Sequence, residues 1–241
     1  MGSVSHPIED TAVLVAEPAT DTKSRLLRVA ERLFAEQGFD GVSVRQLTAA
    51  AGVNLAAVNY HFGSKEGLLA AIFEERCRPM NEERLRRLSD CAEHAHRPPM
   101  LEQIIAAFIA PALASGADPG GGRAAFTRLR ATLSVEHNEV ARALISRYFD
   151  ATSQRFVAAL GRAVPHLSRA ELYWRFHFLL GALYYSMINP GRIAHLSEGL
   201  CDAGEVEAVL TQMVPFIAAG FRAPSLDRSG RGRARRGRRE G

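Results

Sequence analysis

The sequence has few cysteines and no long uncharged apolar run. Its three cysteines, Cys77, Cys91 and Cys201, are far apart and form no CxxC pair, so neither a zinc site nor a disulfide framework is predicted. No stretch of about 18 apolar residues free of charge occurs. The first twenty residues lack the basic start and apolar run of a signal peptide. We therefore expect a cytoplasmic protein in a reducing compartment.

Motifs typical of enzymes are also missing. The sequence contains no GxSxG, Walker, dinucleotide-binding or HExxH pattern, and His94 with His96 in a polar segment makes a poor metal site. We expect no catalytic residue, no cofactor and no bound metal. Turnover of an acyl ester or thioester by the pure protein would reverse this expectation.

Positive charge is concentrated at one end of the chain. The net charge is +4, but the residues from Arg228 onward include seven Arg and one Glu, so the rest of the chain is net negative. One interpretation is therefore a non-specific nucleic-acid binder that depends on this tail. Deleting residues 228–241 would remove nearly all affinity from such a protein, whereas a sequence-specific regulator would retain its binding.

Helical periodicity dominates the chain, with 47% hydrophobic and 23% charged residues, and no convincing alternating strand pattern occurs. The predicted fold is all-α. The first helix covers about residues 22–37 and stops at Gly38, and the second begins at a capping box of Ser43 with Gln46 and ends at Gly52. Further helices are predicted at about 54–60, from Ser64 to a break or kink at Pro79, and at about 81–95, 100–114, 123–134, 138–162, 168–188 and 203–222. Ser115–Gly122 is predicted as a loop, and Ser168 with Glu171 as a second capping box.

The segment from Ser43 to Tyr60 reads as helix, glycine turn and short helix, the spacing of a helix-turn-helix. A plain packed corner between two helices has the same spacing. The residue types favour DNA, because hydroxyls, Arg, Lys and helix N-termini are common phosphate donors. Five side chains are spaced to pack inward: Val44, Leu47, Ala50, Val53 and Val58. Leu55, Ala56 and Asn59 remain for the groove, where Asn can read adenine and small apolar groups can meet thymine methyls.

Residues 22–73, and above all GVNLAAVNYHFGSKEGLL, resemble the DNA-binding region of the tetracycline-repressor (TetR) family. The match includes the turn at Gly52, the Tyr60–His61 pair and the Ser64, Lys65, Glu66 start of the linking helix. The resemblance implies that Leu55, Ala56 and Asn59 contact bases. It also implies phosphate contacts for Ser43, Arg45, Tyr60, His61 and Lys65. The sequence departs from the family at residues 57–59, where Thr-Leu-Tyr is frequent.

Residues 172–188 are apolar on every face, so this helix needs burial on all sides. One face on the subunit core and one on a second subunit would provide it, and we expect a homodimer. The last helix has a similar apolar stripe and should kink at Pro215. The family resemblance agrees, because its members dimerise through their last two major helices. We expect Leu183, Met213 and Ile217 at the interface.

Arg175 and His177 stand inside this apolar helix, and two interpretations are open. In the first, Arg175 is paired with a carboxylate at the dimer interface and His177 is a hydrogen-bonded structural residue. Alternatively, one of them anchors an anionic, apolar ligand in a pocket. The predicted lining is Phe126, Leu129, Leu133, Arg175 and Phe178.

The segments ELYWRFHFLLGALYYSM and MVPFIAAGFRA resemble the PsrA type of TetR regulator. That resemblance implies repression of lipid-metabolism genes and release from operator DNA by a long-chain fatty acid or its acyl-CoA. An efflux-type regulator that senses an aromatic or drug-like compound is the alternative. The expected organisation is a disordered extension (1–20), a helix-turn-helix domain (21–68), a ligand-binding and dimerisation domain (69–224) and a disordered Arg-rich tail (225–241).

Overall fold

The computed structural model describes residues 19–93, 100–116, 122–135 and 139–226, and in these ranges the chain is helical without strands. Residues 1–18 of the expected extension, His94, His96, most of the expected Ser115–Gly122 loop and the tail from residue 227 lie outside them. No described helix is long and apolar enough to cross a membrane. The helices in these ranges are α1 (Ala19–Gln37), α2 (Val44–Ala51), α3 (Ala56–Phe62), α4 (Lys65–Glu93), α5 (Leu101–Gly116), α6 (Gly122–Val135), α7 (Glu139–Ala163), α8 (Arg169–Ile188), α9 (Pro190–Leu196) and α10 (Val206–Arg222).

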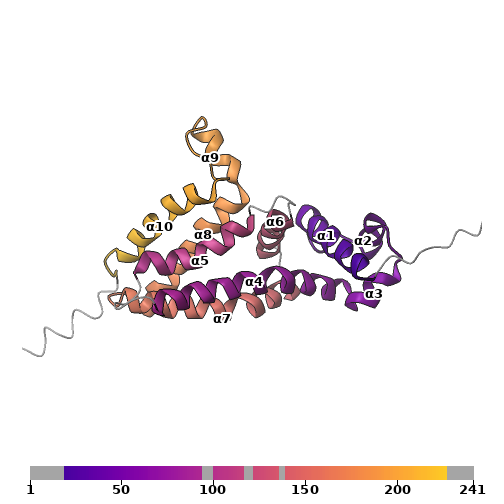
Figure 1. Cartoon of the computed structure of the whole chain (residues 1–241), viewed down its shortest axis with the longest axis horizontal. Helices are drawn as coiled ribbons and strands as arrows, with labels where there is room; N and C mark the ends of the chain where they lie inside the picture. The colour runs from indigo at the N-terminus through magenta and orange to yellow at the C-terminus, as the bar shows by residue number, and fades with distance from the viewer. Residues whose placement is uncertain (1–18, 94–99, 117–121, 136–138, 227–241) are drawn as a thin grey trace, which may run out of the picture.

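The molecule is elongated, with the α1–α3 unit at one end (Figure 1). Helix α4 starts beside α3 and runs along the molecule into the larger part, where it packs on α5 and α7. Helix α6 lies between the two parts and packs against α1. The short helix α9 projects away from the body. The expected all-α fold is confirmed.

Of the break or kink expected at Pro79, the break is wrong, because the 29 residues of α4 form one helix and the segment expected at 81–95 continues it. Proline removes one helical hydrogen bond. The inward side chains on either side of it, Cys77, Met80 and Arg84, are all buried, so packing on both sides holds the helix together. At about 1.5 Å per residue, α4 reaches roughly 43 Å through the molecule.

Two other boundaries differ from expectation. Helix α1 begins at Ala19, three residues before the expected start. Helix α9 was not expected, since residues 189–202 lie between two predicted helices. Pro190 occupies its first position, where the missing N–H costs nothing and the fixed φ favours a helix start.

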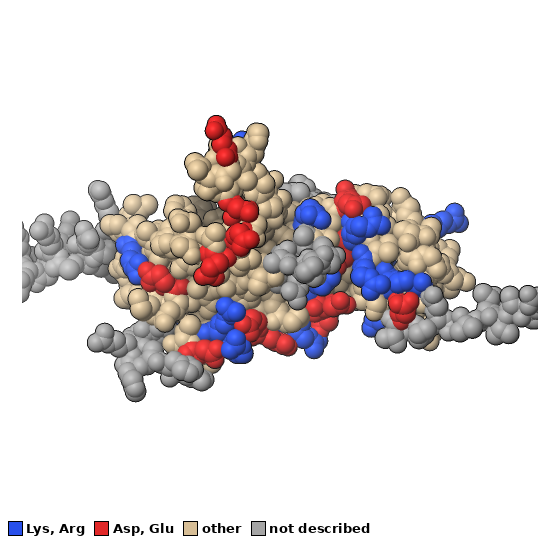
Figure 2. Space-filling view, turned by 45° about the horizontal axis from the view of Figure 1, so that its top comes forward, with Lys and Arg blue, Asp and Glu red and all other residues tan. Residues whose placement is uncertain are grey.

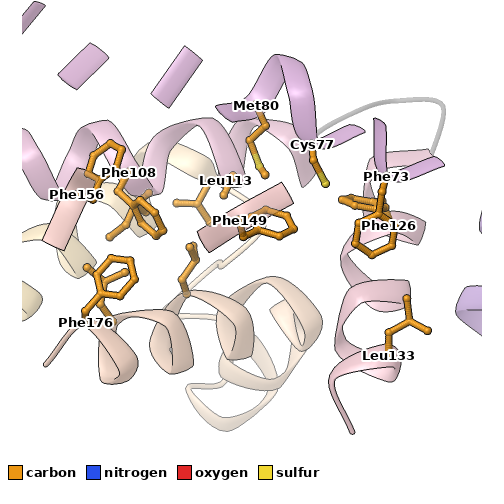
Figure 3. Close-up of a cluster of buried hydrophobic side chains, with 14 of the residues drawn as sticks. Phe73, Cys77, Met80, Phe108, Leu113, Phe126, Leu133, Phe149, Phe156 and Phe176 are labelled. Carbon is orange, nitrogen blue, oxygen red and sulfur yellow. The ribbon is translucent and has the colours of Figure 1, made fainter. Parts of the chain in front are cut away.

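Aromatic side chains fill the larger core (Figure 3). The Phe73 and Phe126 rings meet edge to face with centroids 5.4 Å apart, and Phe108 lies 5.0 Å from Phe156 and 5.1 Å from Phe176. The Phe73 ring also lies 5.9 Å from that of Tyr148 on α7, so the ring contacts join α4, α5, α6, α7 and α8 into one body.

Candidate nucleic-acid interface

The start of α2 is fixed by a reciprocal cap. The Gln46 backbone N–H donates to Ser43 Oγ over 3.2 Å, and Gln46 Oε1 accepts from the Ser43 backbone N–H over 2.8 Å. Both bonds satisfy donors that the helix itself leaves free. The predicted capping box is therefore confirmed.

The turn between α2 and α3 depends on Gly52. This residue has φ +63°, in the left-handed region that favours glycine, and its N–H donates to carbonyls of the last turn of α2. Asn54 Oδ1 then accepts from the Ala56 N–H over 2.9 Å. Since Leu55 occupies the N-cap position, α3 begins slightly later than expected.

A small apolar core holds α1, α2 and α3 together, formed by Leu26, Ala51 and Val58. Leu47 is also buried, and Val44 and Val53 are half-buried. Ala50, expected to face inward, is exposed, and Ala51 is buried in its place. Ala50 and Ala51 are equally apolar, so the sequence pattern could not indicate which of them faces inward.

One exposed surface collects most of the side chains predicted for DNA contact. Leu55 is 48% exposed and Tyr60 is 82% exposed, while Ala56, Asn59 and Arg45 are also exposed. His61 is half-buried, and its ring meets Tyr60 edge to face with centroids 4.9 Å apart. An 82%-exposed tyrosine buries little apolar area, so packing does not account for its position. We call Arg45, Leu55, Ala56, Asn59 and Tyr60 the recognition surface.

Lys65 has a different environment from the one predicted. Its Nζ donates to the Phe39 carbonyl over 2.9 Å and to the Val42 carbonyl over 3.0 Å, and it lies 4.2 Å from the Phe39 ring centroid. These bonds tie the segment between α1 and α2 to the start of α4. These partners give a structural reason for a lysine at a helix N-terminus, and the phosphate contact of Lys65 stays a prediction.

Ser43 is exposed, but its hydroxyl is used within the cap. Its Oγ donates to Gln46 Oε1 over 2.8 Å and accepts from the Gln46 N–H. A phosphate would meet the N-terminal N–H groups of α2 that this cap holds in place.

The α1–α3 end carries only a small excess of positive charge. Residues 19–63 include five Lys or Arg and four Asp or Glu. Figure 2 shows both signs near this end of the molecule, with Lys and Arg side chains gathered there. Any attraction of this unit to DNA therefore comes more from hydrogen-bond donors at fixed positions than from net charge.

The α1–α3 unit is tied to the rest of the chain by a buried ion pair that the sequence did not indicate. Arg76 on α4 donates to Glu31 on α1 from Nε over 2.8 Å and from Nη2 over 2.7 Å, and Glu31 is only 3% exposed. This bidentate geometry fixes the angle between the helices. The partners are 45 residues apart, so no local spacing pointed to the pair.

The residues predicted to line a pocket do not all come together. Phe126, Leu129 and Leu133 are buried on α6, whereas Phe178 is 63% exposed on α8. Arg175 donates to the carbonyls of Gly220, Phe221 and Ala223 over 2.8 to 2.9 Å, and to that of Pro224 over 3.0 Å. Arg175 therefore binds the C-terminal end of α10, which corrects both interpretations made for it.

His177 is exposed, and its ring contacts Trp174 and Phe178. It is therefore on the surface of α8, where the sequence alone suggested a buried, hydrogen-bonded histidine.

The three residues predicted at the dimer interface lie inside the subunit instead. Leu183 is 0%, Met213 9% and Ile217 7% exposed in the single chain. The large apolar side chains that α8 and α10 leave exposed are Trp174 at 62%, Phe178 at 63%, Tyr185 at 58% and Phe216 at 72%. Helix α8 is thus apolar on two sides, as predicted, but the assignment of residues to those sides was wrong.

Comparison with known proteins agrees with this architecture. Residues 26–72 match the family model described as bacterial regulatory proteins, tetR family, and residues 106–220 match the model described as tetracyclin repressor-like, C-terminal domain. The chain belongs to the TetR family. The two matched segments correspond to the α1–α3 unit with the start of α4 and to the helical body from α5 to α10.

Two curated relatives each match only part of this TetR protein. The HTH-type transcriptional repressor AcnR of Corynebacterium glutamicum is 37% identical over 71 residues, which are 30% of this chain and 38% of that relative. The HTH-type transcriptional regulator AcrR of Shigella flexneri is 38% identical over 58 residues, which are 24% of this chain and 27% of that relative. The chain therefore aligns with well under two thirds of either relative.

Solved structures share the fold over most of the chain. The regulator FadR from Bacillus subtilis, solved in complex with stearoyl-CoA, has a TM-score of 0.57 at 17% identity and covers 82% of this chain and 98% of its own. The fatty acid degradation regulator FadR from Bacillus halodurans has a TM-score of 0.58 at 17% identity and covers 83% and 96%. At these identities the likeness concerns the fold.

Proposed function

We propose that this TetR protein is an operator-binding transcriptional regulator, most simply a repressor, that acts as a homodimer and is released from DNA by a small apolar effector. The observation that carries this proposal is the recognition surface, where polar and apolar side chains lie exposed on a short helix held rigidly by a capped α2 and a left-handed glycine turn. A helix presented in this way can enter a major groove.

Within the recognition surface we assign base reading to Leu55, Ala56 and Asn59, and phosphate contact to Arg45 and Tyr60. The half-buried His61 beside this surface is assigned a phosphate contact as well. The N-terminal N–H groups of α2 behind Ser43 add a further phosphate site. Selection of bound sites from random DNA by the pure protein tests this assignment. Asn59→Ala should change which bases are selected, whereas Arg45→Ala should weaken all sequences alike and reduce the slope of log affinity against log salt by about one unit. Equal loss on every sequence for both variants would remove Asn59 from base reading.

We assign the dimer contact to the aromatic face of α8 and α10 formed by Trp174, Phe178, Tyr185 and Phe216. Large apolar side chains this exposed are costly in water, and together they form the kind of surface that association buries. A two-fold dimer would place two recognition surfaces on the same side of the DNA, as a near-palindromic operator requires.

For the effector we propose a long-chain fatty acid or its acyl-CoA thioester, in keeping with the PsrA-type resemblance. A regulator of the same fold binds stearoyl-CoA, and the aromatic core between α4 and α8 offers apolar surroundings to an acyl chain. Helix α4 and the α1–α6 contact join this core to the DNA-binding unit, so rearrangement of the core can change the separation of the two recognition surfaces.

This coupling can be measured, since operator DNA must weaken the effector by the same factor by which the effector weakens DNA. We expect a factor between about 5 and 150. Acyl chains of increasing length are titrated into the dimer with and without operator, and aromatic drug-like compounds are titrated in parallel. Equal effector affinity in the two titrations would remove the fatty acid, and release by the aromatic compounds alone would indicate an efflux-type regulator.

A further inference from the structure

Two arginines are buried inside the larger core. Arg84 on α4 is 1% exposed and Arg130 on α6 is 8% exposed. Each guanidinium lies over an aromatic ring, that of Arg84 4.0 Å from the Phe108 centroid and that of Arg130 3.8 Å from the Phe149 centroid. Arginine is almost never fully buried unless it is paired, and cation–π contact offsets only part of the hydration that is lost.

Arg84 has bonding capacity to spare. In the described part of the chain its Nε donates to the Phe108 carbonyl over 2.9 Å and its Nη1 to Asn81 Oδ1 over 3.3 Å. These acceptors are neutral, and no carboxylate bonds Arg84 among the described residues. The second terminal nitrogen, Nη2, takes no part in these bonds and can donate to a further acceptor.

The two cations also act on each other. Burial lowers the pKa of both guanidinium groups to about 9, and the charge of Arg84 contributes to the lowering at Arg130. Both still carry a positive charge at neutral pH. Like charges in an apolar core repel, and an anion bonded to either guanidinium would relieve this repulsion.

The side chains around Arg84 and Arg130 are mostly apolar, and those contributed by α4 lie on one side of that helix. Phe73, Cys77 and Arg84 follow at helical spacing on the buried side of that helix. Figure 3 shows Cys77 and Phe149 between the Phe73–Phe126 contact and the Phe108 cluster. An acyl chain would therefore meet aromatic and sulfur-containing side chains next to the cations.

We propose that Arg84 and Arg130 form the anion-recognition part of the effector site, and that the effector is an acyl chain with an anionic head. This inference rests on the proposed function, which makes the protein responsive to an effector. The head bonds the guanidinium groups, and the chain lies among the aromatic side chains of α4, α6 and α7. A free carboxylate and the phosphates of a coenzyme A thioester are two sources of the same negative charge.

The position of Arg130 connects this site to both other surfaces. Helix α6 packs against α1, which belongs to the DNA-binding unit. The Arg130 guanidinium also bonds Tyr184 Oη on α8, the helix whose exposed aromatic face we assign to the dimer. An anion bound at Arg130 thus acts on the helix between the core and the DNA-binding unit.

Calorimetric titration of the full chain tests the proposal. Hexadecanoate, hexadecanoyl-CoA and the neutral alcohol hexadecan-1-ol have the same chain, so their comparison isolates the head. We expect hexadecanoate or the thioester to bind the wild-type protein at least tenfold more tightly than the alcohol, and the stronger of the two identifies the source of the anion. Equal affinity for all three probes would overturn the proposal without any variant.

Variants then locate the head. Arg84→Met and Arg130→Met should lower the ratio of anion to alcohol affinity toward one, and Arg130→Lys should keep a ratio above one. Arg128→Met, an exposed residue on the same helix, is the control and should leave the ratio unchanged. A ratio unchanged in folded Arg84→Met and Arg130→Met would overturn the assignment. Operator binding of the wild-type protein and of each variant is measured separately without effector. A wild-type protein that does not bind an operator would contradict the proposed function itself.

Discussion

Lys65 holds two segments of the chain together, because its ammonium donates to the Phe39 and Val42 carbonyls from the start of α4. A lysine at a helix N-terminus opposes the helix dipole, so it needs a compensating partner. The partner could not be identified, because the Phe39 and Val42 carbonyls lie 26 and 23 residues away in the sequence. Arg175 was misassigned for the same reason, since its carbonyl partners belong to the end of another helix. Main-chain acceptors leave no signature in residue types.

We predict that Lys65→Met lowers the free energy of unfolding by about 2 kcal/mol, since a hydrogen bond from a charged group contributes about 1.5 to 3 kcal/mol. Urea denaturation of the pure protein measures this. Lys23→Met, on the exposed side of α1, is the matched control and should change little. Unchanged stability of Lys65→Met, together with a weaker salt dependence of DNA binding, would contradict the structural role and support the phosphate contact.

The hydrogen bonds of Glu171 predict how the stability of the fold depends on pH. It accepts from the Ser168 and Leu226 N–H groups and from the Ser225 hydroxyl, and these bonds, that from Ser168 first, lower its pKa from 4.5 to about 2. A lowered carboxyl pKa stabilises the fold fully above 4.5, and this stabilisation is lost as the pH falls toward 2. Glu171→Gln should therefore flatten the fall of the melting temperature across this pH window. Glu207→Gln, an exposed glutamate of α10, should leave the fall as in the wild-type protein.

At the scale of elements, ends marked by capping residues or glycine were predictable and helix continuity was not. The boxes at Ser43 and Ser168 and the stop at Gly52 are local chemistry, so the sequence located them within a residue or two. Continuation of α4 through Pro79 depends on burial along more than one neighbouring helix. The rotation of α2 that exposes Ala50 likewise depends on packing between elements.

The junction of α3 and α4 gives a prediction for an element. A Cβ placed on Gly67 would lie 2.0 Å from the Phe62 carbonyl oxygen, so the end of α3 and the first turn of α4 can approach only without a side chain there. Gly67→Ala should force them apart, shift the recognition surface and weaken operator binding at least tenfold. A Cβ on Gly191 in α9 would meet nothing within 4 Å, so Gly191→Ala is the control. Equal operator affinity of the two variants would show that this close approach does not position α3.

The apolar pattern of the sequence predicted the organisation of the whole molecule. It did not predict which side chains of a helix face the core and which face outward. A helix that is apolar all round indicates two buried sides but not which residues face which side. Leu183 therefore belongs to the subunit core, while Trp174 and Phe178 stack on the outside with ring centroids 5.9 Å apart. The buried arginines also escaped prediction, because a charged residue in a helix is ordinarily assigned to the solvent face.

The dimer provides the prediction at this scale. Phe178→Glu adds a charge to the exposed aromatic face, so it should dissociate the dimer at micromolar concentration while each subunit stays folded. Sedimentation and circular dichroism measure the two effects separately. Val140→Glu, an exposed apolar residue on α7, should leave the dimer intact. A Phe178→Glu protein that still sediments as a dimer would place the interface elsewhere.

Footprinting on the selected operator tests the central claim most directly, because it reports sequence preference, groove and symmetry together. We predict protection of two half-sites related by a dyad, facing successive major grooves about 34 to 36 Å apart, or farther if two dimers share the site. Deletion of residues 228–241 should leave this pattern in place. Protection without sequence preference, or its loss on deletion of the tail, would contradict the account and favour a non-specific nucleic-acid binder.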